Sequence, residues 1–182
     1  MNSKQIFLSP RNYILQKARS LPIIECLIET EWKEMGITNV LIVRQEPGGK
    51  YTIGYFCVDV FCLGIKNVFC NCHIDEEGRD KLRKSFESGA LNVSPSFAHN
   101  LIYGAVDYAA ELGFSPHKDF PFAENVLDET LIDDGIDEIE FGKNGEPLYF
   151  EGPNDNTKQI IAHLDKFVGE GNYKFVAKAD SF

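Results

Sequence analysis

Three residues of this chain could carry catalytic chemistry, namely Cys62, His117 and Asp59. Cys62 precedes a Leu-Gly pair that predicts a bend, where a thiol could be exposed and activated by a neighbouring base. His117 and Asp119 lie two apart in a predicted turn and would complete a Cys–His–Asp arrangement if the fold brought them to Cys62. One hypothesis is therefore a hydrolase centred on Cys62, with His99 as the other candidate base.

Asp59 interrupts a predicted strand over residues 51–61 that is otherwise largely apolar. A buried carboxylate must find hydrogen bonds or a cation, because burying it alone costs several kcal/mol. It could pair with Lys66, or it could accept backbone N–H groups at the bend. The alternative to these structural roles is a functional pocket that contains both Asp59 and Lys66.

A second group of polar residues lies on the helix predicted over residues 94–112. His99, Tyr103 and Asp107 recur every four residues and therefore form one stripe beside the apolar face of that helix. Such a stripe could be a hydrogen-bond network, an acid/base array or a solvated surface. We include the three residues, with Lys66 and Asp119, among the candidate binding residues.

Four of the five cysteines lie in predicted strands, and two of them form the sequence Cys70-Asn71-Cys72-His73. This spacing is a poor match to the C-x-x-C pairs of zinc sites, because Cys70 and Cys72 share one strand face while His73 points to the other. We interpret these cysteines as small core residues, and we expect no metal and no cofactor. No phosphate-binding, dinucleotide-binding, nucleophile-elbow or H-E-x-x-H pattern points to an enzyme class.

The formal net charge is −10 and is unevenly distributed. Nine acidic residues and no Lys or Arg lie between positions 119 and 142, without the ladder of an EF-hand loop. The segment could be a solvated loop or could contact a basic protein. An acidic chain argues against nucleic-acid and anionic-membrane partners. The absence of an export signal and of a long apolar run predicts a cytoplasmic protein with reduced thiols.

Residues 39–72 are the richest in apolar, β-branched and aromatic side chains, and they predict a central antiparallel meander. Helices are expected to flank it over residues 9–20, 22–35, 75–88, 94–112 and 156–168, with a short helix near 121–127. A second hairpin is predicted over residues 136–150, and a last strand over residues 172–177. The length suits one domain over residues 1–182, with residues 1–8 expected to be flexible.

Two blocks of sequence carry a resemblance to other proteins. The first runs from Tyr55 to Asn67 (YFCVDVFCLGIKN), and the second from Ala98 to Phe120 (AHNLIYGA…LGFSPHKDF). With Leu21-Pro22-Ile23 and residues 141–145, they resemble an uncharacterised family of bacterial proteins. The resemblance implies a bacterial, cytoplasmic origin and a single domain. It also marks five of the candidate residues as a shared set: Asp59, Cys62, Lys66, Tyr103 and Asp119.

These observations predict an α+β fold with a central antiparallel sheet over residues 39–73. The function expected first is that of a non-enzymatic binding or adaptor protein with a basic protein partner. The Cys/His-dependent hydrolase centred on Cys62 is the alternative.

Overall fold

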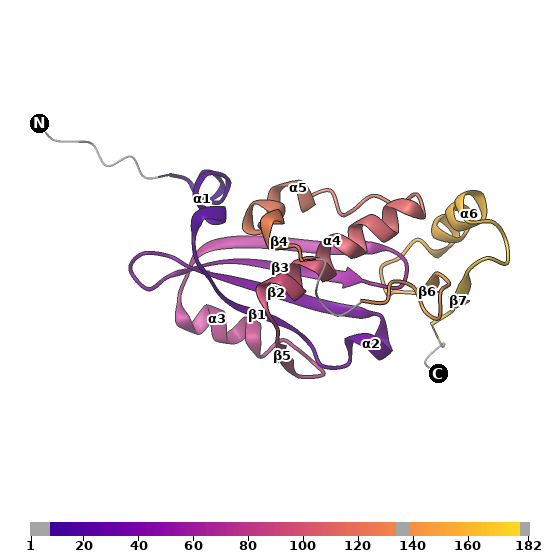
Figure 1. Ribbon diagram of the computed structural model, residues 1–182, viewed down its shortest axis with the longest axis horizontal. Helices are drawn as coiled ribbons and strands as arrows, with labels where there is room; N and C mark the ends of the chain where they lie inside the picture. Colours follow the sequence, from indigo (N-terminus) through magenta and orange to yellow (C-terminus); the bar gives the residue numbers. More distant parts are fainter. Residues whose placement is uncertain (1–7, 134–138, 179–182) are drawn as a thin grey trace, which may run out of the picture.

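A computed structural model describes residues 8–133 and 139–178 of the chain. Its centre is a five-stranded antiparallel sheet with the order β4-β3-β2-β1-β5 (Figure 1). Helices lie on both faces, so the predicted α+β fold with a central antiparallel sheet is confirmed. The strands are β1 (Ile23–Glu29), β2 (Ile37–Gln45), β3 (Tyr51–Asp59), β4 (Gly64–Ile74) and β5 (Ala90–Asn92).

The predicted meander forms through β2, β3 and β4. At one end, Gly48 and Gly49 adopt positive φ angles of 84° and 79° in the turn between β2 and β3. At the other end, Gly64 has a φ of 67° and lies against α4, where an added Cβ would approach the Ala105 carbonyl oxygen to 2.9 Å. Glycine is therefore required at Gly64 both for the backbone conformation and for the close approach of the helix.

The helix expected over residues 22–35 is wrong. Ile23–Glu29 is strand β1, which pairs with β2 on one side and with β5 on the other. Only Trp32–Met35 is helical (α2), and Gly36 ends it in the left-handed conformation with a φ of 69°. A strand with neighbours on both sides and cover on both faces is apolar nearly throughout, and a short apolar run of this kind also fits helical spacing.

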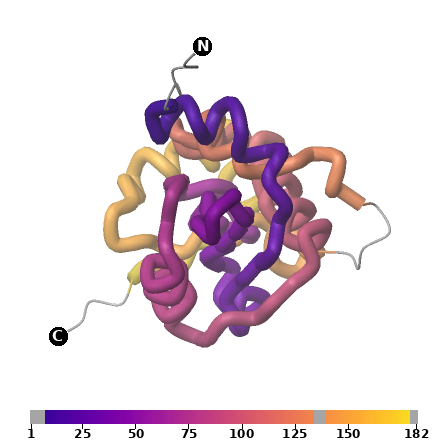
Figure 2. The backbone as a smooth tube through the Cα atoms, turned by 90° about the vertical axis from the view of Figure 1, so that its left-hand side faces the viewer, coloured from indigo at the N-terminus to yellow at the C-terminus, as the bar shows by residue number. Residues whose placement is uncertain are grey.

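One face of the sheet, here called the α4 face, is covered by α4 (Pro95–Glu111) and by the N-terminal helix. Ser94 caps α4 by accepting the Phe97 N–H, and proline takes the first helical position. Figure 2 shows the N-terminal helix (indigo) beside the orange segment that follows α4. The N-terminal segment consists of α1 (Pro10–Lys17) and the short 3-10 helix η1 (Ala18–Ser20). The segment after α4 consists of α5 (Phe120–Ala123) and the 3-10 helices η2 (Glu124–Val126) and η3 (Glu129–Leu131).

The opposite face, here called the α3 face, carries α3 (Glu76–Arg83). Phe86 and Leu82 pack there on apolar side chains of three strands. This second core contains Leu27, Leu41, Val43, Tyr51 and Ile53. Leu41 and Leu27 pair at the middle of the sheet, and the other three lie toward the end where β2 turns into β3, so this core does not extend to the other end of the face.

The C-terminal part of the chain forms a small unit beyond the end of α4 (Figure 1). It consists of β6 (Leu148–Phe150), α6 (Thr157–Phe167) and β7 (Lys174–Val176). β6 pairs in parallel with β7, 26 residues further along the chain at Leu148–Lys174, and not with the preceding segment as the predicted hairpin required. Of that hairpin, the described residues retain an isolated antiparallel bridge between Lys143 and Glu146.

Two predictions concern parts of the chain that lie outside the described residues. The flexible segment expected over residues 1–8 falls there except for its last residue, and the strand expected over residues 136–141 falls there in part. Residues 139–141 are not in a strand. Across the described ranges, no helix has the length and apolar character needed to cross a membrane.

Candidate functional site

Cys62 lies in the turn between β3 and β4, and its side chain is fully buried. It packs in a third apolar cluster with Leu112, Tyr149 and Leu164. Burial raises the pKa of the thiol, and the nearby Asp59 raises it further. Since the thiolate is the nucleophilic form of cysteine, this environment works against nucleophilic chemistry at Cys62.

Asp59 is also buried, and it organises the same turn. Its Oδ1 atom accepts the backbone N–H groups of Phe61 and Cys62, both at 2.9 Å. Burial raises the pKa of Asp59 to about 6, although these hydrogen bonds and the charge of Lys66 act in the opposite direction. Of the two structural roles considered for Asp59, the geometry therefore matches the acceptor of backbone N–H groups at the bend.

Lys66 forms its ion pair with a residue 89 positions further along the chain. Its Nζ atom lies 2.8 Å from Asp155 Oδ2, and both side chains are mostly buried. The same carboxylate accepts hydrogen bonds from the Tyr149 hydroxyl and the Gly152 N–H. Lys66 thus attaches the loop before α6 to the edge of the sheet, and its charge is neutralised there.

His99 is completely buried, and both of its ring nitrogens have backbone partners. Nδ1 lies 2.6 Å from the Pro95 carbonyl oxygen, and Nε2 accepts the Asp128 N–H at 3.0 Å. Burial lowers the pKa of His99, which favours the neutral ring that these two bonds require. From His99 to Ala109, which packs against the β3–β4 turn, α4 runs for about 15 Å at 1.5 Å per residue. His99 is therefore remote from Cys62.

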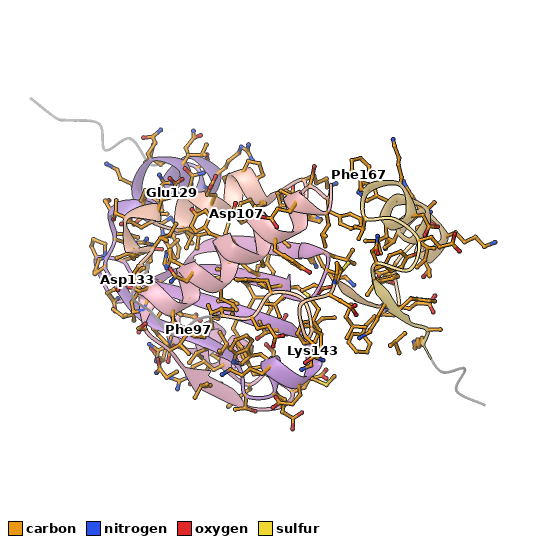
Figure 3. The ribbon with its side chains drawn as sticks, turned by 45° about the vertical axis from the view of Figure 1, so that its right-hand side comes forward. Phe97, Asp107, Glu129, Asp133, Lys143 and Phe167 are labelled. Atoms are coloured by element: carbon orange, nitrogen blue, oxygen red, sulfur yellow. The ribbon has the colours of Figure 1, made fainter. Side chains whose placement is uncertain are left out.

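The other members of the predicted α4 stripe have separate surroundings. The Tyr103 hydroxyl donates to Glu124 at 3.3 Å, and burial raises the pKa of Tyr103. Asp107 is exposed on the outer side of α4 (Figure 3). The stripe therefore divides into a buried histidine, a half-buried tyrosine and an exposed aspartate, and forms no single array.

His117 and Asp119 do meet, as the spacing suggested. The Asp119 N–H donates to His117 Nδ1 at 3.3 Å, and the Asp119 carboxylate lies 3.8 Å from the same nitrogen. The His117 backbone N–H donates to the Ile65 carbonyl oxygen, which attaches this turn to the start of β4. The pair lies at the surface, with the Asp119 side chain 59% exposed.

Glu46 is a buried carboxylate that no pattern in the sequence singled out. It accepts hydrogen bonds from the Thr52 hydroxyl at 2.7 Å and from the His73 N–H at 2.7 Å, and its Oε2 lies 2.6 Å from His73 Nδ1. His73 reaches it through a left-handed backbone conformation with a φ of 59°. Burial acts to raise the pKa of Glu46, but these partners outweigh it and the net pKa is lowered. His73 is therefore a hydrogen-bond partner of Glu46. No group of three His, Cys, Asp or Glu residues suited to a metal occurs in the described ranges.

The uncovered end of the α3 face holds two neighbouring hollows, which we together call the open groove. The acidic hollow has a volume of about 640 Å³, and the aromatic hollow one of about 400 Å³. Both are lined by Ile37 and Asn39 of β2, so they adjoin. Ile37 and Asn39 alternate in phase with Leu41, which places them on the face that α3 covers further along.

The acidic hollow is lined by four carboxylates, from Glu29, Glu31, Glu34 and Glu87. Glu29 is buried and already accepts hydrogen bonds from the Asn39 amide and from the Ser88 N–H and hydroxyl. The other three are exposed, and no ion pair joins them to another described residue. This site was not predicted from the sequence, because its four glutamates come from two distant segments, residues 29–34 and residue 87, both of which were expected to be helical.

The aromatic hollow lies over β3 and β4, beside the loop that Asp155 holds. Tyr55 and Phe69 stack there, with ring centroids 5.1 Å apart and planes 18° apart. Phe69 is 46% exposed, so its ring is accessible to a ligand. Lys66 also lines this hollow, but Asp155 neutralises it. This end of the groove therefore offers apolar surface with no net charge.

Comparisons of the chain with protein-family models, with curated proteins and with solved structures found no match.

Proposed function

We propose that this chain is a non-enzymatic binding protein that holds a basic segment of a partner protein in the open groove. The observation that carries the proposal is the lining of the acidic hollow, where Glu31, Glu34 and Glu87 project into solvent without an ion-pair partner in the described part of the chain. A concave surface with one sign of charge raises the local concentration of ligands of the opposite sign. The resemblance to a bacterial family supports a partner in the bacterial cytoplasm.

The acidic segment over residues 119–142 is a weaker candidate for the same partner. Several of its described carboxylates already have partners within the chain. Asp128 accepts from Thr130, Glu124 accepts from Tyr103, and Glu140 accepts the Asn144 N–H. A carboxylate with internal hydrogen bonds gains less from a new cation than one that is free in solution.

The hydrolase centred on Cys62 has less support than binding. Its proposed nucleophile is buried with a raised pKa. Both ring nitrogens of His99 are occupied by backbone groups, and His117 faces Asp119 at the surface. We therefore favour binding over catalysis.

The test is a titration with a fluorescein-labelled peptide that carries an Arg-Arg pair in a Gly-Ser background. Neutralising three exposed carboxylates (Glu31→Gln, Glu34→Gln and Glu87→Gln) is expected to weaken binding about tenfold, since each exposed pair contributes about 0.5 kcal/mol. The matched control removes three charges from the acidic segment (Asp119→Asn, Glu129→Gln and Glu140→Gln) and should change affinity less than twofold. Equal losses in both variants, or a loss in the control alone, would overturn the assignment to the groove.

A further inference from the structure

The acidic hollow combines charge with apolar surface. Met35 is 60% exposed beside the half-buried Ile37, and the carboxylates of Glu31 and Glu34 lie around them. The long side chains of lysine and arginine match this combination, because their methylene stems pack on apolar groups while their charged ends reach carboxylates. A small hydrated cation would gain nothing from the apolar part.

The aromatic hollow is suited to a different kind of side chain. Its one cation, Lys66, is neutralised by Asp155 at 2.8 Å, so a charged ligand gains little there. Phe69 presents an exposed ring that is held in place by its stack on Tyr55, and Tyr55 is itself fixed by its contact with Ser85 at 3.2 Å. An aromatic or large aliphatic side chain would bury this ring without disturbing the stack.

Two asparagines line the aromatic hollow, and each has half of its amide in use. The Asn39 amide nitrogen donates to Glu29, and the Asn67 amide oxygen accepts the Val68 N–H. In the described part of the chain this leaves an acceptor on Asn39 and a donor on Asn67. Asn39 on β2 and Asn67 on β4 lie on either side of Cys57 of β3, their shared register partner. A peptide backbone needs one acceptor and one donor of this kind.

The spacing of the strands sets the length of the segment. Glu29 lies on β1 and Phe69 on β4, three strands away. Neighbouring strands are about 4.8 Å apart, so three spacings give about 14 Å. The row of Phe69 ends on β1 at Leu27, two residues from Glu29, which brings the span to about 16 Å, or about four to five residues of extended chain.

We infer that the segment held in the open groove is bipartite, with a lysine or arginine in the acidic hollow and an aromatic or large aliphatic residue about four positions away on Phe69. This inference rests on the proposed function and specifies the partner of the same site. The segment lies across the strands, with its backbone between Asn39 and Asn67.

The experiment compares the Arg-Arg peptide with versions that carry a tryptophan two, four or eight positions from the pair. Tryptophan at four positions is expected to tighten binding about three- to tenfold, with a smaller gain at two or eight. Phe69→Ala should abolish that gain and leave the Arg-Arg peptide unaffected, while Phe69→Leu should retain part of it. Leu15→Ala is the matched control, since Leu15 is 44% exposed on α1 at the other face of the sheet.

The outcomes separate the two proposals. If the Arg-Arg peptide binds as expected but tryptophan adds nothing at any spacing, or if the gain survives Phe69→Ala, the bipartite segment is wrong and the basic-segment proposal stands. If the Arg-Arg peptide does not bind, both fail. Circular dichroism checks that the fold of each variant is intact. If Phe69→Ala does not fold, Phe69→Leu still tests the contact with tryptophan.

Discussion

Strand β3 has a buried carboxylate at each end, and the two differ in how they are satisfied. Glu46 lies beside the start of the strand and is 4% exposed, while Asp59 is its last residue and is 2% exposed. Glu46 has the Thr52 hydroxyl, a backbone N–H and the His73 ring as partners, and its net pKa is lowered. Asp59 has backbone N–H groups at the turn, and burial raises its pKa to about 6.

The comparison shows that burial alone does not set the charge of a carboxylate in this sheet. At Glu46 the hydrogen bonds from the His73 N–H, the Thr52 hydroxyl and the His73 ring together outweigh burial, and the pKa is lowered. At Asp59 burial outweighs the backbone N–H groups and the charge of Lys66, and the pKa is raised. The two ends of β3 are therefore expected to respond to pH in opposite directions.

The largest expected effect comes from removing the acceptor at the turn. Asp59→Ala should lower the free energy of unfolding by about 4 kcal/mol, because two buried N–H groups would each lose a partner at a cost of about 1–3 kcal/mol. Urea unfolding at pH 4, where the contribution of Asp59 is close to full, measures this loss. Asp107→Ala, at an exposed position on α4, should change stability by less than about 0.5 kcal/mol. A loss of similar size in both variants would show that Asp59 contributes no more to stability than an exposed aspartate.

Asp59→Asn separates the hydrogen bonds of this residue from its charge. Because the folded pKa of about 6 lies above the ordinary 3.8, the contribution of Asp59 is full below pH 3.8 and is lost as the pH rises through 6. That loss amounts to about 3 kcal/mol, the free energy that corresponds to a pKa raised from 3.8 to about 6. The stability of Asp59→Asn relative to the unsubstituted chain should therefore improve by this amount between pH 4 and pH 7. Parallel curves from urea unfolding across that range would contradict the raised pKa.

Glu46→Gln should have the opposite pH dependence. The lowered pKa of Glu46 means that its contribution is present above pH 4.5 and is lost as the pH falls through the folded pKa. At pH 7 the variant should lose about 2 kcal/mol, since a neutral amide replaces a charged acceptor of three hydrogen bonds. Glu77→Gln, where the glutamate is 79% exposed, is the control and should be nearly neutral. If Glu46→Gln loses as much at pH 3 as at pH 7, the lowered pKa is wrong.

The last prediction changes no residue and concerns the reactivity of Cys62, which lies in the turn beside Asp59. Iodoacetamide at pH 7 should label it much more slowly in the folded protein than in urea, because the thiol is buried and its pKa is raised. Mass spectrometry of the tryptic peptides reports the extent of labelling at each cysteine. Labelling of Cys62 as fast as that of an exposed thiol would restore the hydrolase hypothesis.

Local patterns predicted much of this fold. Ser-Pro pairs marked the starts of α1 and α4, and glycines marked the turns of the meander. The apolar residues of β1 led to the wrong prediction of a helix, because the spacing of Leu27 and Ile28 fits a helix face as well as a buried strand. Only the pairing with β2 and β5 decides between the two. The parallel pairing of β6 with β7 depends on packing beyond α4, which no local pattern specifies.

The candidate site was less predictable than the fold. The polar bend at Asp59 was identified, but its partners were not, since Lys66 bonds to Asp155 across 89 positions. The burial of Glu46 was not predicted, because it depends on His73 and on the return of β4. The open groove brings Glu87 to three glutamates within residues 29–34, and it exists only where α3 stops short of covering the sheet.

The outer strand β4 has a consequence for how this protein meets its neighbours. It is eleven residues long and lies at the edge of the sheet, a position where an incoming chain can add as a further strand. Asn67 and Asn71 each accept the N–H of the following residue, so two of the donors that such a chain would use are already engaged. The edge is therefore a poor template for intermolecular β-pairing, and the protein should stay dispersed at concentrations where a bare strand of this length would seed aggregation.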